Sequence, residues 1–242
     1  MRAIILSAGQ GSRLLPLTEG RPKCLLPMGA KTLIEWQIWA LAQNGVDDIA
    51  VVTGYHAEDV DAVLHRLAGP RLAIRTVFNP FHKLADNLAS CWMARAEMDR
   101  DFILLNGDTV VEPACVARLL ASLPAPITVT IDRKENGYDA DDMKVHLKGT
   151  RLLEIGKHLP PGRADAESIG MLMFREGGPT LFTDMLETMM RRPEGLKAFY
   201  LRAINQISTE TPVETCSIEG LRWGEVDFPA DLERAAAMVQ GF

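Results

Sequence analysis

Paired cysteines and long apolar runs are missing from this chain, and a secretory leader is not expected at its first residues. Its 242 residues include four cysteines, and none of them belongs to a C-x-x-C pair. Widely spaced cysteines are typical of reduced thiols, which argues against a zinc site or a disulfide scaffold. No apolar stretch reaches the roughly 18 residues that span a bilayer, and the first residues already resemble a buried strand rather than a leader. We therefore expect a cytoplasmic protein without membrane insertion.

Positive charge is scarce overall but concentrated near the N-terminus. The formal net charge is -6, which argues against non-specific nucleic-acid binding because that requires a broad basic face. Residues 1–31 nevertheless carry five Lys or Arg residues and only one acidic residue. This local excess predicts that the N-terminal segment binds an anion.

A glycine loop follows the first apolar run. Residues 3–6 are apolar and lead into Gly9 and Gly11, a pattern typical of a buried strand that ends in a phosphate-wrapping turn. Glycine lets backbone N–H groups approach an anion closely. Leu14 stands where the dinucleotide fingerprint and the ATPase phosphate loop each need glycine or another small residue, so both are excluded. A nucleoside triphosphate cradle is the favoured interpretation, and a plain strand-to-helix turn is the structural alternative.

Strand and helix patterns alternate along the chain, which predicts an α/β fold with a doubly wound, mostly parallel sheet. In such sheets ligands bind beyond the carboxyl ends of the strands, so the first glycine loop should lie at the site. Strands are expected at residues 49–53, 72–78, 101–105, 127–131 and 213–218, with a hairpin at 143–147 and 151–155. Helices are expected at residues 32–45, 57–67, 88–98, 112–120, 179–190 and 196–207.

Three short segments resemble the nucleotidyltransferases that make sugar and alcohol nucleotides. They are Ala8 to Arg13 with Arg21-Pro22-Lys23, then Gly107-Asp108-Thr109, and finally Glu225-Val226-Asp227. The resemblance covers residues 1 to about 232 and implies the nucleotide-diphospho-sugar transferase fold, a Rossmann-like sheet with a small β-rich lobe for the acceptor. We expect one domain over residues 1–242, with nucleotide binding mainly in 1–131 and acceptor and metal binding mainly in 132–228.

The resemblance also implies roles for individual residues. The triphosphate would be held by Ala8, Gly9, Gln10, Gly11, Ser12 and Arg13. Asp86, Asn87 and Ser90 form a segment similar to that of phosphocholine and related polyol-phosphate cytidylyltransferases, where it reads the nucleobase. Asn and Ser both donate and accept hydrogen bonds, which suits cytosine; helix capping is the structural alternative for this segment. Relatives place acceptor-binding groups in the β-rich lobe, which here points to Tyr138, Lys144, Lys157 and Glu167.

The implied reaction is in-line attack by a phosphate monoester on the α-phosphorus of the triphosphate, which releases pyrophosphate. It needs charge neutralisation rather than a general base, in agreement with five histidines that form no recognisable triad. Mg²⁺ would be bound by Asp108 and Asp227, with Glu225 as a further ligand. Arg13 and Lys23 would stabilise charge on the transferring group.

These expectations converge on Mg²⁺-dependent transfer from CTP to a small phosphate or phosphonate monoester such as phosphocholine. The alternative is a hexose-1-phosphate nucleotidyltransferase that uses UTP, GTP or dTTP. A choline head group favours an aromatic cage, and aromatic residues make up only 6% of the chain, so polyol and sugar phosphates stay open. A non-catalytic nucleotide-binding regulatory protein is disfavoured because the charged residues of all three segments are present.

Overall fold

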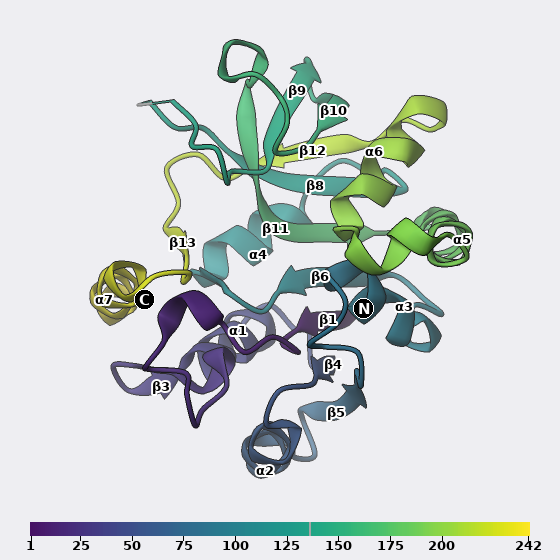
Figure 1. Cartoon of the computed structure of the whole chain (residues 1–242). Coiled ribbons are helices and arrows are strands. Elements are labelled where there is room, and N and C mark those ends of the chain that lie inside the picture. Colours follow the sequence, from purple (N-terminus) through teal and green to yellow (C-terminus); the bar gives the residue numbers. More distant parts are fainter. Residues whose placement is uncertain (136) are drawn as a thin grey trace.

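A mixed β-sheet with helices on both faces forms the centre of the computed structural model, which describes residues 1–135 and 137–242 (Figure 1). Within these residues the sheet has nine strands in the order β5-β4-β1-β6-β11-β8-β12-β10-β9. The strands are β1 Arg2–Leu6, β4 Asp48–Thr53, β5 Ala73–Phe78, β6 Phe102–Asn106, β8 Ile127–Asp132, β9 Lys144–Lys148, β10 Arg151–Ile155, β11 Ala166–Phe174 and β12 Glu214–Ser217. The expected α/β class is confirmed.

Parallel pairing is confined mainly to the N-terminal half of the sheet. Strands β5, β4, β1 and β6 are all parallel, as the alternation of strands and helices predicts. β11 pairs antiparallel with both β6 and β8, and the β9–β10 hairpin is antiparallel as well. β11 therefore joins the parallel part of the sheet to the part with antiparallel pairing, and all nine of its residues are buried.

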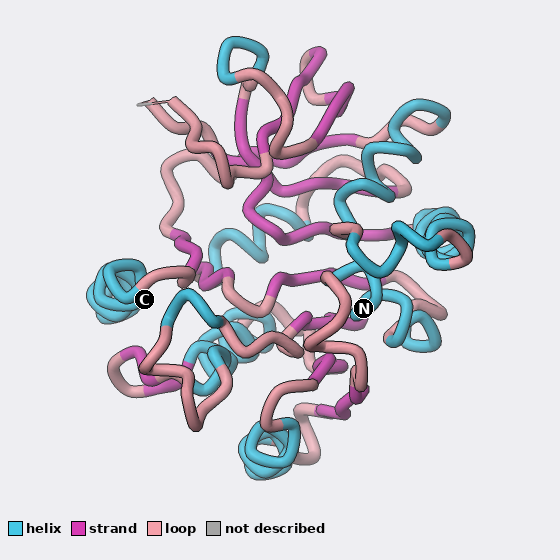
Figure 2. The backbone as a smooth tube through the Cα atoms, in the orientation of Figure 1, coloured by secondary structure: helices cyan, strands magenta, loops and turns pink. Residues whose placement is uncertain are grey.

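Two sets of helices cover the two faces of the sheet (Figure 2). α3 (Asn87–Met93), α5 (Gly178–Met190) and α6 (Tyr200–Glu210) pack on one face, whose core includes stacked Phe102 and Phe174 with ring centroids 4.4 Å apart. α1 (Leu33–Ala42), α2 (Ala57–Leu67) and α4 (Pro113–Leu120) contribute to the core on the other face. The four cysteines are buried and free.

A third, smaller core lies beside the N-terminal loop and includes the C-terminus. It contains residues of α7 (Pro229–Met238), of the short strand β2 (Pro27–Met28) and of α1. β2 pairs with the short strand β3 (Lys31–Thr32). The C-terminal Phe242 stacks on Trp39 and meets Trp36 edge-on. This packing fixes α7 next to the two-stranded sheet of β7 (Thr109–Val111) and β13 (Trp223–Glu225).

Six 3-10 turns complete the described elements. They are η1 Ser12–Leu14, η2 Lys23–Leu25, η3 Arg95–Glu97, η4 Pro161–Arg163, η5 Pro193–Lys197 and η6 Val239–Gly241. Two of them replace parts of expected helices: the helix expected at 88–98 ends at Met93, and the one expected at 196–207 begins only at Tyr200. Asn87 Oδ1 accepts a hydrogen bond from the Tyr200 backbone N–H at 2.9 Å, so the start of α6 is set by a contact with α3.

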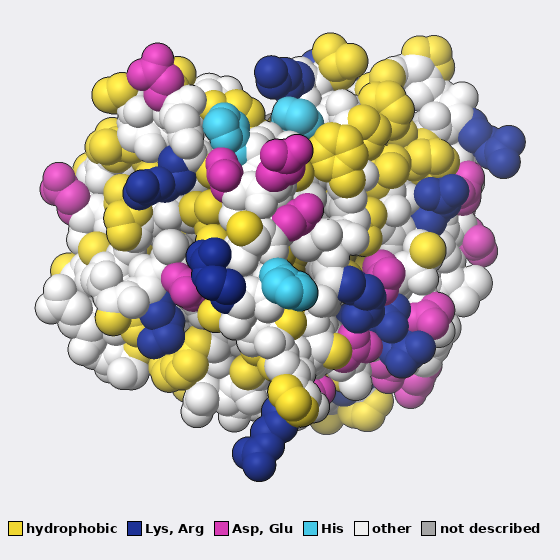
Figure 3. Space-filling view, turned by 90° about the horizontal axis from the view of Figure 1, so that it is seen from below, with side chains coloured by type: hydrophobic (Ala, Val, Ile, Leu, Met, Phe, Trp, Pro, Cys, Tyr) yellow, Lys and Arg dark blue, Asp and Glu magenta, His cyan; other side chains and the backbone are white. Residues whose placement is uncertain are grey.

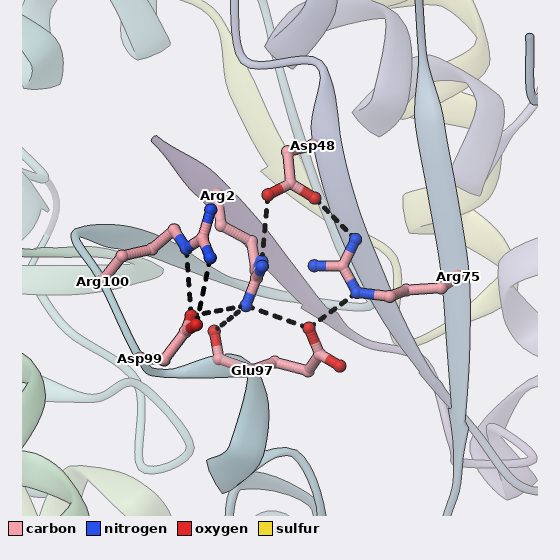
Figure 4. A network of polar contacts seen from close by, with 6 residues as sticks. All are labelled: Arg2, Asp48, Arg75, Glu97, Asp99 and Arg100. Carbon is pink, nitrogen blue, oxygen red and sulfur yellow. Dashed lines mark hydrogen bonds and ion pairs between the residues drawn. The ribbon is translucent and has the colours of Figure 1, made fainter.

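A network of ion pairs ties together the strand ends opposite the glycine loop (Figure 4). Arg2 lies 3.1 Å from Asp48, 3.0 Å from Glu97 and 2.8 Å from Asp99. Arg75 contacts Asp48 and Glu97 from the neighbouring strand. Burial alone would raise the pKa of Asp48, but hydrogen bonds from Arg75 and Arg2 hold it below its usual value. These charges therefore stabilise the fold away from the site.

The surface agrees with the acidic composition. On the face in Figure 3, seen from below Figure 1, Lys and Arg side chains lie among Asp, Glu and His. Positive charge therefore does not dominate this face. Among the described residues, no helix has the length and apolar character needed to cross a membrane.

Candidate functional site

Two carboxylates that are distant in sequence are brought together by β7 and β13. Asp108 directly precedes β7 and Asp227 follows β13, and the two strands pair antiparallel with Glu225 opposite Thr109. The pairing continues as Val226 N–H donates to the Asp108 carbonyl at 3.0 Å. Gly107 allows this turn to pass the end of β1, because a Cβ there would lie 2.2 Å from the Leu6 carbonyl oxygen.

Lys23 lies between these two carboxylates. Its Nζ is 3.1 Å from Asp108 Oδ2 and 2.7 Å from Asp227 Oδ1. Burial lowers the pKa of Lys23, but the two carboxylates outweigh burial and raise it above its usual value. Arg13 Nη2 contacts the other oxygen of Asp227 at 2.8 Å. Burial raises the pKa of Asp227, and Lys23 and Arg13 more than offset this, so its pKa is lowered.

The glycine loop closes over the Lys23 side chain. Gly11 has φ of 76°, in the left-handed region that favours glycine. A Cβ on Gly11 would lie 2.9 Å from Lys23 Cβ, so only glycine lets the loop and the lysine pack this closely. Thr18 Oγ1 donates to the Gly11 carbonyl at 2.9 Å and holds the turn. Lys23 therefore packs against the glycine loop and also contacts both carboxylates.

A cavity of about 230 Å³ lies above this loop. Its lining includes Gly9, Gly11, Ser12, Arg13, Lys23, Asp108 and Asp227, so the structure brings most of the predicted triphosphate and metal residues together. Two predicted neighbours have other roles. Ala8 is buried and its carbonyl accepts from Tyr55 N–H at 2.9 Å, and Gln10 Nε2 lies 3.4 Å from the Thr18 carbonyl.

A larger cleft of about 890 Å³ shares Arg13, Asp108 and Asp227 with this cavity and extends toward the β-rich lobe. Lys157 lies in it, 3.6 Å from Asp141, and Arg13 approaches the same carboxylate at 3.7 Å from the other side. Two segments of the chain thus meet across the cleft through one aspartate.

Two glutamates of the cleft have raised pKa values. Glu167 is buried, and burial raises its pKa to about 7 although its ion pair with Lys134 at 2.9 Å works against this. Glu225 is exposed to the cleft, whose walls partly desolvate it, and the neighbouring Asp108 and Asp227 add repulsion. Its pKa is therefore well above its usual value.

The predicted nucleobase segment is only partly at the cleft. Asn87 lines the cleft and caps α6 through Tyr200 N–H. Ser90 is buried, and its Oγ accepts from Asn79 Nδ2 at 3.0 Å. Asp86 contributes a backbone N–H that donates to the Leu196 carbonyl at 2.8 Å. Asp86 is the N-cap residue of α3 but forms no side-chain capping hydrogen bond, and the Asn87 side chain binds α6 instead. The capping alternative is therefore wrong for this helix, and base reading remains a prediction for Asn87.

The predicted acceptor residues divide in the same way. Lys157 and Glu167 line the cleft, whereas Lys144 and Tyr138 are not among its described lining residues. Lys144 is buried, and its Nζ donates to the Asp139 carbonyl at 2.8 Å, with two more carbonyls of the same loop within 3.4 Å. Its ammonium group is engaged in holding this loop, so we do not propose Lys144 as a ligand of the acceptor.

Two carboxylates of the cleft, Asp132 and Asp231, were not predicted from the sequence. Trp223 Nε1 donates to Asp132 Oδ2 at 2.7 Å, and both residues line the cleft. Asp231 Oδ2 accepts from the backbone N–H groups of Asp227 and Phe228 at 3.0 and 2.7 Å. Proline at the first helical position followed by an acidic residue in the first turn is a local signal that identifies Asp231 as a cap.

The donor set fits a divalent cation such as Mg²⁺. Asp108 Oδ1 is buried and has no hydrogen-bond partner, and Asp108 and Asp227 already converge on one positive group, the ammonium of Lys23. Among the described residues, no group of three or more His, Cys, Asp or Glu is arranged to hold a metal. Mg²⁺ requires fewer protein ligands, because one or two carboxylates suffice when substrate phosphates and water complete its shell.

Residues 3–192 match the family model of the MobA-like NTP transferase domain. The chain belongs to this family. A CMP-5'-(3-aminopropyl)phosphonate synthase of Streptomyces rubellomurinus is 31% identical over 97% of this chain, which spans 38% of that protein. A CTP:phosphoglutamine cytidylyltransferase of Campylobacter jejuni is 28% identical, with 96% and 98% of the two chains covered.

Solved structures share the fold of this family member. The CTP:phosphocholine cytidylyltransferase of Streptococcus pneumoniae superposes with a TM-score of 0.79 at 21% identity, with 98% of each chain covered. An inositol-1-phosphate CTP transferase of T. maritima gives 0.82 at 19%, over 99% of this chain and 96% of that one. An apo UDP-glucose pyrophosphorylase gives 0.83 at 13%, over 100% and 98%. The expected nucleotide-diphospho-sugar transferase fold is confirmed.

Proposed function

We propose that this protein transfers a nucleotidyl group, CMP from CTP in the first instance, to a small phosphate or phosphonate monoester and releases pyrophosphate. The observation that carries the proposal is the contact of Lys23 with both Asp108 and Asp227 beneath the glycine loop. This places the N-terminal phosphate-binding pattern and the two metal-type carboxylates at one point.

The chemistry requires two polyanions to approach each other. The acceptor phosphate has a second pKa of about 6 and is mostly dianionic at neutral pH, so it needs no base to become a nucleophile. Arg13 and Lys23 would stabilise negative charge on the transferring phosphoryl group and on the departing pyrophosphate. Asp108 and Asp227 would hold Mg²⁺, with Glu225 nearby, and the metal supplies charge neutralisation when bound. Gly9 to Ser12 would hold the triphosphate through backbone N–H groups.

The choice of CTP rests on the relatives and on Asn87. Both curated relatives described above carry CTP or CMP in their names, and Asn87 lines the cleft. The alternative is a hexose-1-phosphate nucleotidyltransferase that uses UTP, GTP or dTTP, which is supported by the equally similar fold of a UDP-glucose pyrophosphorylase. The two functions share the phosphate and metal residues and differ in base and acceptor.

Pyrophosphate release with Mg²⁺ tests the proposal. Each nucleoside triphosphate is combined with phosphocholine, 2-aminoethyl phosphate, 2-aminoethylphosphonate, inositol phosphate and hexose 1-phosphates. We expect release with CTP and a small phosphate or phosphonate, strong loss in Lys23→Met, and no change in Lys148→Met, which removes an exposed charge on the β9–β10 hairpin. Release only with UTP, GTP or dTTP and a sugar phosphate would favour the alternative.

A further inference from the structure

The large cleft carries an excess of negative charge. Nine acidic residues line it against four basic ones, and the acidic residues still exceed the basic ones by three when Glu167 and Glu225, whose pKa values are raised, are counted as neutral. The acidic residues are Asp108, Asp132, Asp139, Asp141, Asp142, Glu167, Glu225, Asp227 and Asp231. A bound divalent cation would offset two of these charges, while an acceptor phosphate would add more. A cleft of this charge favours an acceptor that also has a positive group.

Unpartnered side-chain atoms in this cleft point to the same kind of ligand. Glu167 is one of them: its side chain is only 5% exposed, Oε2 pairs with Lys134 at 2.9 Å, and Oε1 is buried without a hydrogen-bond partner. Asn106 Oδ1 is in the same condition. Both are oxygens that accept hydrogen bonds, and a buried acceptor without a donor costs about 1–3 kcal/mol. A ligand that fits here must therefore donate hydrogen bonds.

The surroundings of Glu167 add a further carboxylate and one aromatic ring. Asp132 lies opposite Glu167 in the pairing of β8 with β11. Its Oδ2 accepts from Trp223 Nε1 at 2.7 Å, and the tryptophan lines the cleft beside it. Lys134 is shared between Glu167 and Asp142, at 2.9 and 2.8 Å, so a single cation serves two carboxylates.

We propose that the acceptor carries a primary ammonium group in addition to its phosphate or phosphonate, and that Glu167 binds this group through Oε1. The proposal rests on the proposed function and specifies its acceptor class. An ammonium group has three N–H donors and no acceptor, which matches the unpartnered oxygens. A trimethylammonium group has no N–H and favours aromatic faces. Three aromatic side chains line the cleft, Phe199, Trp223 and Phe228, and Lys157 and Arg13 already lie over the rings of Phe199 and Phe228.

Charge supports the same assignment. Burial raises the pKa of Glu167 to about 7 despite the nearby Lys134. Lys134 alone therefore does not keep this carboxyl group fully ionised at neutral pH. A ligand ammonium group at Oε1 would supply the additional positive charge. A neutral hydroxyl in the same place would donate a hydrogen bond but leave the charge uncompensated.

Three acceptors that differ at one group test the proposal. They are 2-aminoethyl phosphate, the nearly isosteric 2-hydroxyethyl phosphate, and phosphocholine, each with CTP and Mg²⁺. We expect kcat/KM to be at least about tenfold higher for the amine than for either of the others, as charge-assisted hydrogen bonds of this kind contribute. Glu167→Gln should reduce the amine-to-hydroxyl ratio of kcat/KM about tenfold, mainly through KM for the amine.

Glu58→Gln, on the exposed side of α2, is the matched control and should keep the wild-type ratio. Glu167→Asp keeps the charge and should give an intermediate ratio, which separates charge recognition from loss of folding. The proposal is overturned if the wild type favours the hydroxyl or trimethylammonium acceptor, or if folded Glu167→Gln keeps the wild-type ratio. Absence of pyrophosphate release with every triphosphate and acceptor would instead overturn the proposed function itself.

Discussion

The ion pairs of Lys23 make a prediction that can be tested without knowing the substrate. In Lys23→Met, Asp108 and Asp227 lose the cation between them, while the methionine keeps most of the apolar contact with Gly11. Removing one partner from a buried ion pair costs about 3–5 kcal/mol. The Lys23 side chain is 11% exposed, but those of Asp108 and Asp227 are 31% and 21% exposed, and partial exposure lets water compensate.

We therefore expect the variant to lose about 2–3 kcal/mol of unfolding free energy at pH 7, below the full cost of breaking a buried pair. For a chain of this size this corresponds to a fall in Tm of about 4–12 °C. The loss should depend on pH. The pKa of Asp227 is lowered in the wild type, so its contribution is present above the unfolded pKa of about 3.9 and disappears as pH falls through the lower folded value. The Tm difference should shrink below pH 4.

Mg²⁺ supplies a second, independent readout. In the wild type a cation at Asp108 and Asp227 competes with Lys23, whereas in Lys23→Met the two carboxylates are available. At a concentration ten times its Kd, a ligand stabilises the folded state by about 1.4 kcal/mol. Mg²⁺ should therefore raise the Tm of the variant by about 3–6 °C, and that of the wild type by less.

Thermal unfolding by circular dichroism, at pH 7 and pH 3.5 and with and without Mg²⁺, measures all of these effects. Lys148→Met provides the control for loss of a lysine charge and should unfold like the wild type. An unchanged Tm in Lys23→Met, or equal stabilisation of both proteins by Mg²⁺, would refute the view that Lys23 occupies the position of a cation between the carboxylates.

Four further variants test other parts of the structure. Asp108→Asn and Asp227→Asn should each lower turnover on the order of a hundredfold or more because each removes a metal ligand; a folded variant with near-normal turnover would exclude the residue as a ligand. Gly11→Ala should cost about 1–3 kcal/mol, since φ is positive there and a Cβ meets the lysine beneath, and calorimetry measures this loss. Arg2→Met should cost about 1–2 kcal/mol at pH 7, between the values for exposed and buried ion pairs, because Asp48 and Glu97 lose one of two arginine partners and keep Arg75. Because the pKa of Asp48 is lowered, denaturant titrations should show that cost narrowing below about pH 4.

Elements that depend on local pattern were predicted well from the sequence. The expected helix at 57–67 coincides with α2, and the strand expected at 127–131 differs from β8 by one residue. The hairpin around Gly149 is present, with φ of 65° at that glycine. In each case hydrophobic periodicity and a turn residue lie within the same short segment, so no distant contact is needed to define the element.

Elements and roles that depend on distant contacts were predicted less well. The start of α6 at Tyr200 is set by Asn87, 113 residues away, and a pattern of apolar spacing contains no information about such a partner. Asp132 and Trp223 are similar, because their hydrogen bond joins the end of β8 to the start of β13. A tryptophan in a glycine-rich turn gives no local indication that its N–H meets a carboxylate.

The contrast between Lys23 and Lys144 shows where sequence reasoning about a site reaches its limit. Both are buried lysines in segments that resemble functional motifs. Lys23 reaches two carboxylates because β7 and β13 place Asp108 and Asp227 around it. Lys144 instead meets the carbonyl oxygens of its own loop. An ammonium group is directed by the acceptors that surround it, and strand pairing, rather than the identity of the lysine, determines whether those acceptors belong to a site or to the backbone.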